Sequence, residues 1–197
     1  VRYNISQDDG IINGGSMGIW KNDERGVMRN CEIYNNTFYN SNPGGSSIWL
    51  YSNYPGFNFR NNVFIYNGSL LSEGNKLKDE VFQGNLYWNL KGDKSFLNFR
   101  NLEEWASKTG KEMLGDVFTG MYQDPLLQDP GGLELTDPDR IADNLSAYTP
   151  QNASPLINRG LNLKELFGLE PGPQDITGKA IPIDEKYDIG AVEHRSP

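Results

Sequence analysis

One short block recurs along the first half of the chain. It consists of an apolar residue, two variable residues, an asparagine and a strand-forming residue that is apolar in most copies. The four copies place their asparagines at Asn4, Asn36, Asn62 and Asn85, so successive copies are 32, 26 and 23 residues apart. Repeats of about 20–30 residues are typical of a solenoid in which each turn of the chain contributes short strands.

A second recurring element is shorter. Gly18-Ile19-Trp20 and Ser47-Ile48-Trp49 match each other at a spacing of 29 residues, and Ser69-Leu70-Leu71 is a weaker third copy. In a parallel solenoid, equivalent residues of neighbouring turns lie above one another. The alignment therefore predicts that the isoleucines of the first two copies stack on each other, and that the tryptophans do the same.

The repeating pattern ends after about Phe96. Residues 101–110 are predicted to form a short helix with Asn101 as its N-cap, Glu104 three residues later as in a capping box, and Gly110 as its stop. Three apolar residues of this helix are expected to face the solenoid: Leu102, Trp105 and Ala106.

The last third of the chain is rich in proline. Residues 125–197 hold 9 of the 11 prolines, and because proline cannot donate a hydrogen bond to a strand ladder, long regular strands are not expected there. A second short helix is predicted over 161–167. The organisation expected from these patterns is a set of solenoid turns over 1–95, a helical insertion over 96–122 and a capping segment over 123–197 that folds along the end and side of the solenoid.

Asparagine is the most unusual component of the sequence. There are 22 asparagines among 197 residues, and 18 of them lie in residues 1–101. Asparagine is a poor strand former, but it tolerates left-handed backbone angles and forms hydrogen bonds along stacks of itself. We therefore expect the four repeat asparagines to form a structural ladder along the solenoid.

Charge and composition exclude several classes of protein. A net charge of −8 argues against a nucleic-acid partner, which would require a basic face. No apolar run approaches the 18 residues of a membrane span. The single cysteine, Cys31, excludes an intrachain disulfide and a cysteine zinc site, and the single histidine, His194, makes a Ser–His triad improbable. Catalysis would then depend on carboxylates, Lys, Arg, Tyr or bound calcium.

The sequence resembles a known family in its repeats and in its tail. The blocks VRYNISQDDG, CEIYNNTFYN and FNFRNNVF look like turns of the right-handed parallel β-helix proteins, the pectate-lyase-like superfamily of secreted carbohydrate-active proteins. The tail resembles the C-terminal ending of many such proteins in four stretches: 123–126, 153–160, 175–178 and 188–193. The similarity covers nearly the whole chain and is more specific for the fold than for the reaction.

This resemblance implies an all-β fold, a right-handed single-stranded parallel β-helix with a short helical insertion and an irregular C-terminal cap. Each turn would have three strands, with the asparagine in a tight turn between strands two and three. Strand one would include 19–20 and 48–49, strand two 31–34 and 57–60, and strand three 37–39, 63–65 and 86–88.

In the resembled family, the substrate groove runs along strand one and its flanking loops. If Ile19 and Ile48 point into the core, alternation sends Trp20 and Trp49 outward, where their rings would stack on sugar faces. The alternative is a register shifted by one residue, in which both tryptophans lie in the core and the isoleucines lie outside.

Asp8 and Asp9 are adjacent on the loop between strand three and strand one. They are candidates for a general base or for calcium ligands, and Gln7-Asp8-Asp9-Gly10 faintly resembles the paired aspartates of polygalacturonase-like β-helices. The alternative is a solvated turn whose aspartates cap backbone amides.

A charged loop follows strand one of the first turn. It holds Glu24, a candidate catalytic carboxylate, and Arg25, which with Tyr51 completes the predicted substrate-binding set. Hydrolysis of a glycosidic bond needs two carboxylates, whereas β-elimination needs a base and a cation such as Arg25, Lys76 or calcium. The alternative is that these charges are only solvated.

Three functional classes follow from these observations. The first is a secreted polysaccharide-active enzyme, either a glycoside hydrolase or a polysaccharide lyase. The second is a noncatalytic carbohydrate-binding or surface module on the same scaffold. The third is a structural solenoid fragment whose active portion lies upstream, because the residues from Val1 onward are already predicted to form a strand.

The expected partner is a polysaccharide or oligosaccharide, with no nucleic acid and no transmembrane segment. The expected location is secreted, periplasmic or on the surface of a bacterium.

Overall fold

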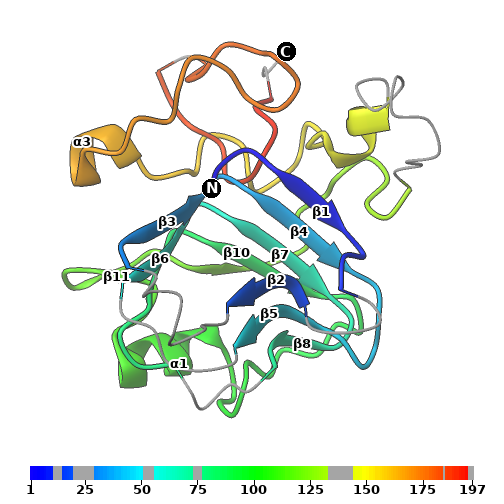
Figure 1. Cartoon of the computed structure of the whole chain (residues 1–197), viewed down its shortest axis with the longest axis vertical. Coiled ribbons are helices and arrows are strands. Elements are labelled where there is room, and N and C mark those ends of the chain that lie inside the picture. Colours follow the sequence, from blue (N-terminus) through cyan, green and yellow to red (C-terminus); the bar gives the residue numbers. More distant parts are fainter. Residues whose placement is uncertain are drawn as a thin grey trace, which may run out of the picture.

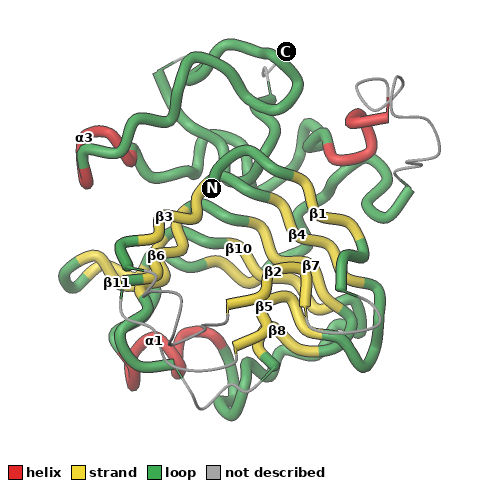
Figure 2. The backbone as a smooth tube through the Cα atoms, viewed as in Figure 1, coloured by secondary structure: helices red, strands yellow, loops and turns green. Residues whose placement is uncertain are grey.

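Three parallel sheets form the body of the molecule (Figures 1 and 2). The computed structural model describes residues 1–10, 15–19, 29–50, 56–72, 77–132, 144–183 and 185–194. We name each sheet by its first strand. The β1 sheet contains, in spatial order, β1 (Ile5–Gln7), β4 (Thr37–Asn40), β7 (Val63–Tyr66), β10 (Leu86–Asn89) and β13 (Met121–Tyr122).

The other two sheets have three strands each. The β2 sheet contains β2 (Gly15–Ile19), β5 (Ser46–Leu50) and β8 (Ser69–Leu71), and the β3 sheet contains β3 (Cys31–Tyr34), β6 (Phe57–Arg60) and β9 (Val81–Gln83). The chain visits the sheets in rotation, and each strand from β1 to β7 pairs in parallel with the strand three elements later, as does β10 with β13. This arrangement is a parallel β-helix, so the predicted fold class is confirmed, and the strands predicted around the asparagines lie within one residue of the observed bounds.

The register of the β2 sheet differs from the predicted alignment. Ile19 pairs with Leu50 rather than with Ile48, a shift of two residues, and Ile48 pairs with Leu71 rather than with Leu70. A two-residue shift preserves which face a side chain occupies, so Ile19 still faces the core. The one-residue error arose because Leu70 and Leu71 are both leucine, and alternation cannot distinguish them.

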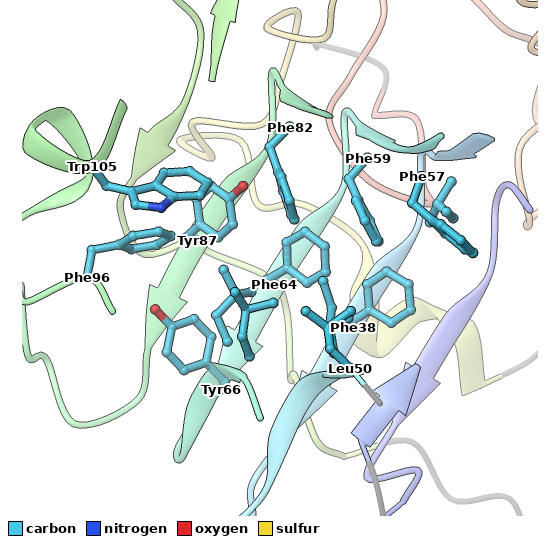
Figure 3. Close-up of a cluster of buried hydrophobic side chains, with 14 of the residues drawn as sticks. Phe38, Leu50, Phe57, Phe59, Phe64, Tyr66, Phe82, Tyr87, Phe96 and Trp105 are labelled. Atoms are coloured by element: carbon cyan, nitrogen blue, oxygen red, sulfur yellow. The ribbon is translucent and has the colours of Figure 1, made fainter. Parts of the chain in front are cut away.

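Like side chains stack along the core (Figure 3). Phe38, Phe64 and Tyr87 are register partners whose rings lie nearly parallel, with centroids 5.1 and 5.5 Å apart. Phe59 and Phe82 form a second stack with centroids 4.6 Å apart. Because each coil repeats the same inward position, aromatic residues at those positions become continuous columns.

The predicted asparagine ladder is confirmed. The Oδ1 atom of each later asparagine accepts two hydrogen bonds from the asparagine one coil earlier, from its backbone N–H and from its Nδ2. These distances are 3.0 and 2.9 Å from Asn4 to Asn36, 3.1 and 2.9 Å from Asn36 to Asn62, and 2.9 and 3.0 Å from Asn62 to Asn85. Asn36, Asn62 and Asn85 are fully buried, so the ladder satisfies amides that water cannot reach.

The helix α1 (Leu102–Thr109) closes the core beyond the last coil. As predicted, Asn101 caps it by accepting a hydrogen bond from the Glu104 N–H at 2.9 Å, and it ends at Gly110 in the left-handed conformation. Its buried Trp105 lies edge-on to Phe82 and Tyr87. An antiparallel hairpin that the sequence did not indicate follows, formed by β11 (Met113–Leu114) and β12 (Val117–Phe118).

The C-terminal segment covers the outer face of the β1 sheet. This segment contains a 3-10 helix, η2 (Leu145–Tyr148), and the helix α3 (Leu163–Phe167), which begins two residues later than predicted. Residues of the segment pack against outward side chains of β7 and β10 in a second buried cluster, which includes Val63, Ile65, Leu86, Leu127, Tyr148, Leu156 and Ile189. The middle of the β1 sheet, at Val63, Ile65 and Leu86, is therefore buried on both faces. In the described part of the chain, no helix has the length and hydropathy needed to cross a membrane.

Candidate functional site

Four of the predicted site residues, Trp20, Glu24, Arg25 and Tyr51, lie outside the described residues. Trp49 is described and lies half-buried on β5, while its neighbour Ile48 is fully buried in the core. The alternation predicted for this pair is therefore present. The register partner of Trp49 in the preceding coil is Gly18, and a Cβ atom at Gly18 would lie 3.7 Å from the Trp49 ring.

Asp8 and Asp9 both accept hydrogen bonds from neighbouring turns. The Asp8 Oδ1 atom accepts the backbone N–H of Ser41 at 2.6 Å, which joins the turn after β1 to the equivalent turn of the next coil. The Asp9 Oδ2 atom accepts the Ser6 hydroxyl at 2.8 Å. The Asp8 contact is of the amide-capping kind that was the alternative for this pair, whereas Asp9 accepts a side-chain hydroxyl. Among the residues that the structure describes, no group of three or more His, Cys, Asp or Glu side chains is arranged to hold a metal ion.

Asp8 also belongs to a larger polar cluster, which we name the Tyr39 site: Gln7, Asp8, Tyr39, Asp129 and Tyr148. Gln7 and Tyr39 are register partners on the outer face of β1 and β4. The Tyr148 ring lies edge-on to the Tyr39 ring, with centroids 6.4 Å apart. The Tyr148 hydroxyl donates to the Gln7 Oε1 atom at 2.8 Å and accepts the Gly131 N–H at 3.3 Å.

The two carboxylates give this cluster a negative potential. Burial raises the pKa of Tyr39, and the charges of Asp8 and Asp129 raise it further. Burial likewise raises the pKa of Tyr148, and Tyr39, Asp8 and Asp129 add to the shift. Both hydroxyls therefore remain protonated over the physiological pH range, so the site combines hydrogen-bond donors, carboxylate acceptors and the half-exposed face of Tyr39.

A cavity adjoins the Tyr39 site. It has a volume of about 380 Å³, and Asp129 belongs to both. Four of its six lining residues have polar side chains: the lining consists of Gln128, Asp129, Gly132, Asn144, Ser146 and Ala147. A volume of this order accommodates a small ligand of one or two rings.

A second cavity of about 390 Å³ lies beside α1. Lys111 is its most buried charged residue, and its ammonium group donates to the backbone carbonyl groups of Glu80 at 2.7 Å and Lys78 at 3.2 Å. Burial lowers the pKa of Lys111. Because Lys111 is already engaged with the chain that precedes β9, we regard it as a structural lysine.

Buried carboxylates of the tail are also structural. Glu193 is 1% exposed, and burial, together with the charge of Asp188, raises its pKa to about 8. Asp188 accepts the backbone N–H groups of Asn158 and His194, both at 2.7 Å, and Asp175 accepts that of Glu193 at 2.8 Å. These groups hold the tail together and are closed to any ligand in the present conformation.

Sequence reasoning identified Asp8 but missed Asp129, Tyr39 and Tyr148. Tyr148 and Gln7 are 141 residues apart in the chain, and no spacing or periodicity connects them. The turn sequence Gln128-Asp129-Pro130-Gly131-Gly132 was the one local signal, because it marks an exposed loop that carries a carboxylate.

Comparison with known proteins does not assign the chain to a family. No protein-family model matches the chain, and no curated protein matches it in sequence.

Proposed function

We propose that the chain is part of a carbohydrate-active β-helix protein of the pectate-lyase-like kind, and that it binds a polysaccharide or oligosaccharide at the Tyr39 site. The observation that carries this proposal is the half-exposed ring of Tyr39, flanked by Asp8 and Asp129 and next to a cavity of about 380 Å³. The resemblance of the repeats and the tail to secreted β-helix proteins supports it. The same resemblance favours a secreted or cell-surface location in a bacterium.

The chemistry of the site suits a sugar. The C–H face of a pyranose ring packs on an aromatic ring, and its hydroxyl groups donate to carboxylates. Asp129 is exposed and lines the cavity. The Asp8 Oδ1 atom accepts a hydrogen bond from the Ser41 backbone N–H, and this bond fixes the orientation of the Asp8 carboxyl group.

Glycoside hydrolysis is a second candidate function. Hydrolysis requires a pair of carboxyl groups on either side of the glycosidic bond, and Asp8 and Asp129 both act on the same tyrosine ring. β-Elimination would need a base with a cation or calcium, and Arg25, the predicted cation, lies outside the described residues.

Affinity electrophoresis tests the proposal. The protein is run in native gels cast with polygalacturonate, alginate, xylan or β-glucan, and we expect one of them to retard it. Asp129→Asn should reduce the retardation and Tyr39→Ala should abolish it. Asp116→Asn, at an exposed site on the β11–β12 hairpin, is the matched control and should leave it unchanged.

Two results would contradict glycan binding at this site. The first is free migration of the wild-type protein in every gel. The second is wild-type retardation of both Asp129→Asn and Tyr39→Ala, after circular dichroism has shown that they are folded. The products separate the reactions: a lyase releases unsaturated uronates that absorb in the ultraviolet, and a hydrolase releases only new reducing ends.

A further inference from the structure

The cavity beside α1, which we name the α1 cavity, has no part in the proposed function. Its volume is about 390 Å³, and it lies between α1, the residues on either side of α1 and the chain that precedes β9. Three of its lining residues are apolar, Leu77, Phe99 and Trp105, and two are cationic, Lys78 and Lys111. None of its described lining residues carries a carboxylate, so the α1 cavity differs in charge from the cavity at the Tyr39 site.

Lys111 is the cation that the protein satisfies least completely. An ammonium group has three N–H donors. The structural role of Lys111 uses two of them, in the hydrogen bonds from its Nζ atom to the backbone carbonyl groups of Glu80 and Lys78. Among the described residues, Lys111 forms no salt bridge and no further side-chain hydrogen bond. An ammonium group on a residue that is only 8% exposed therefore has one donor without a protein partner.

The carboxylates near Lys111 do not supply that partner. The Glu80 carboxylate accepts the Lys78 backbone N–H at 2.7 Å, and Asp79 is exposed. Burial lowers the pKa of Lys111, and the charges of Glu80 and Asp79 offset only part of this shift. A buried ammonium group is costly unless an anion is hydrogen-bonded to it. An anion bound in the α1 cavity would reduce that cost.

The apolar part of the lining favours a ligand with a ring. The Trp105 ring is held in place because it lies edge-on to Phe82 and Tyr87 (Figure 3). Leu77 and Phe99 are half-buried, so part of their apolar surface remains open. An aromatic ring gains contact area against such side chains and prefers offset or edge-on contacts with other rings. A cavity of this volume accommodates one substituted ring.

We propose that the α1 cavity binds a small aromatic carboxylate with a single negative charge. Its ring would pack against Phe99 and Trp105, and one of its carboxylate oxygens would accept the third N–H of Lys111. A single charge matches the site better than the double charge of a phosphate group, because Lys111 has one donor left and the carboxylates of Asp79 and Glu80 are close by.

Titration with benzoate, followed by two-dimensional NMR of the complete chain, tests the proposal. We expect the backbone amide signals of Asn98 and Thr109, which line the α1 cavity, to shift as benzoate is added. The signals of Gly132 and Ser146, which line the cavity beside the Tyr39 site, should stay in place. The proposal therefore stands or falls separately from glycan binding at the Tyr39 site.

Two other small molecules separate the contributions of charge and ring in the wild-type protein. Benzamide has nearly the shape of benzoate without its charge, and should bind at least about 10-fold more weakly because a charge-assisted hydrogen bond is lost. Acetate keeps the charge without the ring, and should also bind at least about 10-fold more weakly because it buries little apolar surface.

Substitutions then assign the binding to particular side chains. Lys111→Met should weaken benzoate binding by at least about 10-fold, whereas Lys108→Met, at an exposed position of α1, is the matched control and should change it by less than about 2-fold. Because Lys111→Met also removes two structural hydrogen bonds, Phe99→Ala is a second variant, and it should weaken binding through the loss of ring contact. Circular dichroism shows whether each variant is folded.

Several results would overturn the proposal. One is the absence of any shift at Asn98 and Thr109 with millimolar benzoate. Another is equal affinity of the wild-type protein for benzoate and benzamide, or for benzoate and acetate, which needs no variant to measure. Shifts at Gly132 and Ser146 in place of Asn98 and Thr109 would also overturn it, as would wild-type affinity for benzoate in a folded Lys111→Met protein.

Discussion

The coils of residues 1–89 and the C-terminal segment, residues 123–132 and 144–194, stabilise opposite faces of the β1 sheet in different ways. In the coils, the same contact recurs at each turn, as in the Phe38–Phe64–Tyr87 column and the asparagine ladder. In the C-terminal segment, each contact occurs once. Examples are the Asp188 carboxylate that accepts two backbone amides and the Arg60 guanidinium 4.1 Å above the Phe167 ring. Because the contacts of the coils repeat, the sequence pattern predicts them. The contacts of the C-terminal segment occur once each, so no sequence pattern predicts them.

The largest expected effect is on the aromatic column. Phe64→Ala removes a ring that is stacked between Phe38 and Tyr87 and fully buried, and should lower the free energy of unfolding by about 3–5 kcal/mol. Leu166→Ala, on the exposed side of α3 in the C-terminal segment, is the control and should change it by less than about 0.5 kcal/mol. Urea denaturation measures both. Similar losses in the two variants would show that the column is not the main support of the sheet.

The next effect is on the ladder. Asn62→Ala leaves the Asn36 N–H and Nδ2 without an acceptor and removes the Nδ2 donor, but not the backbone N–H donor, of the Asn85 Oδ1 atom, and should cost about 2–3 kcal/mol. Asn98→Ala, at an exposed position, should be close to neutral. Thermal melts compare the two variants. A neutral Asn62→Ala would mean that the ladder contributes no stability.

One buried glutamate, Glu112, follows the last coil, and another, Glu193, lies in the C-terminal segment, which predicts a pH dependence. Burial raises the pKa of Glu112 from 4.5 to about 7 and that of Glu193 from 4.5 to about 8. Between these values the folded protein binds more protons than the unfolded chain, so the free energy of unfolding falls as the pH rises through this window. We therefore expect the melting temperature to be lower at pH 8 than at pH 5.

Two substitutions divide this pH dependence between Glu112 and Glu193. Glu112→Gln should remove the part that develops up to about pH 7, and Glu193→Gln the part that extends to about pH 8. Melting curves recorded across this pH range measure both. A pH profile that neither substitution changes would place the titrating group elsewhere.

The smallest effect concerns one contact between the two regions. Tyr148→Phe removes the hydrogen bond to the Gln7 Oε1 atom while keeping the ring against Tyr39, and should cost about 1 kcal/mol. A loss as large as that of Asn62→Ala in the same denaturation experiment would mean that single contacts of the C-terminal segment matter as much as repeated ones.

The sequence predicted those features that depend on local or repeated patterns. The ladder asparagines, the strands beside them and both caps of α1 follow from residue types at fixed spacings. The register of the β2 sheet was wrong because its strands are short and its two leucines are equivalent under alternation. Glu112, whose carboxylate accepts the Asn85 N–H and Nδ2, was missed because it is not an asparagine and does not lie at the register equivalent of Asn85, which is Gly120.

The candidate site was predicted less completely than the fold. Asp8 was identified from its place in a loop, but the Tyr39 site is assembled by the C-terminal segment, which brings Tyr148 and Asp129 to the first coil. Contacts between segments so far apart depend on tertiary packing and leave no local pattern in the chain.

The most direct test of the account is hydrogen exchange in Asn62→Ala, because the central claim is that the coils are joined by a directional ladder. The backbone N–H of Asn36 donates to the Asn62 Oδ1 atom, whereas that of Asn85 donates to Glu112. We predict that the substitution accelerates exchange at Asn36 far more than at Asn85. Equal acceleration at both amides, or none at either, would contradict the ladder.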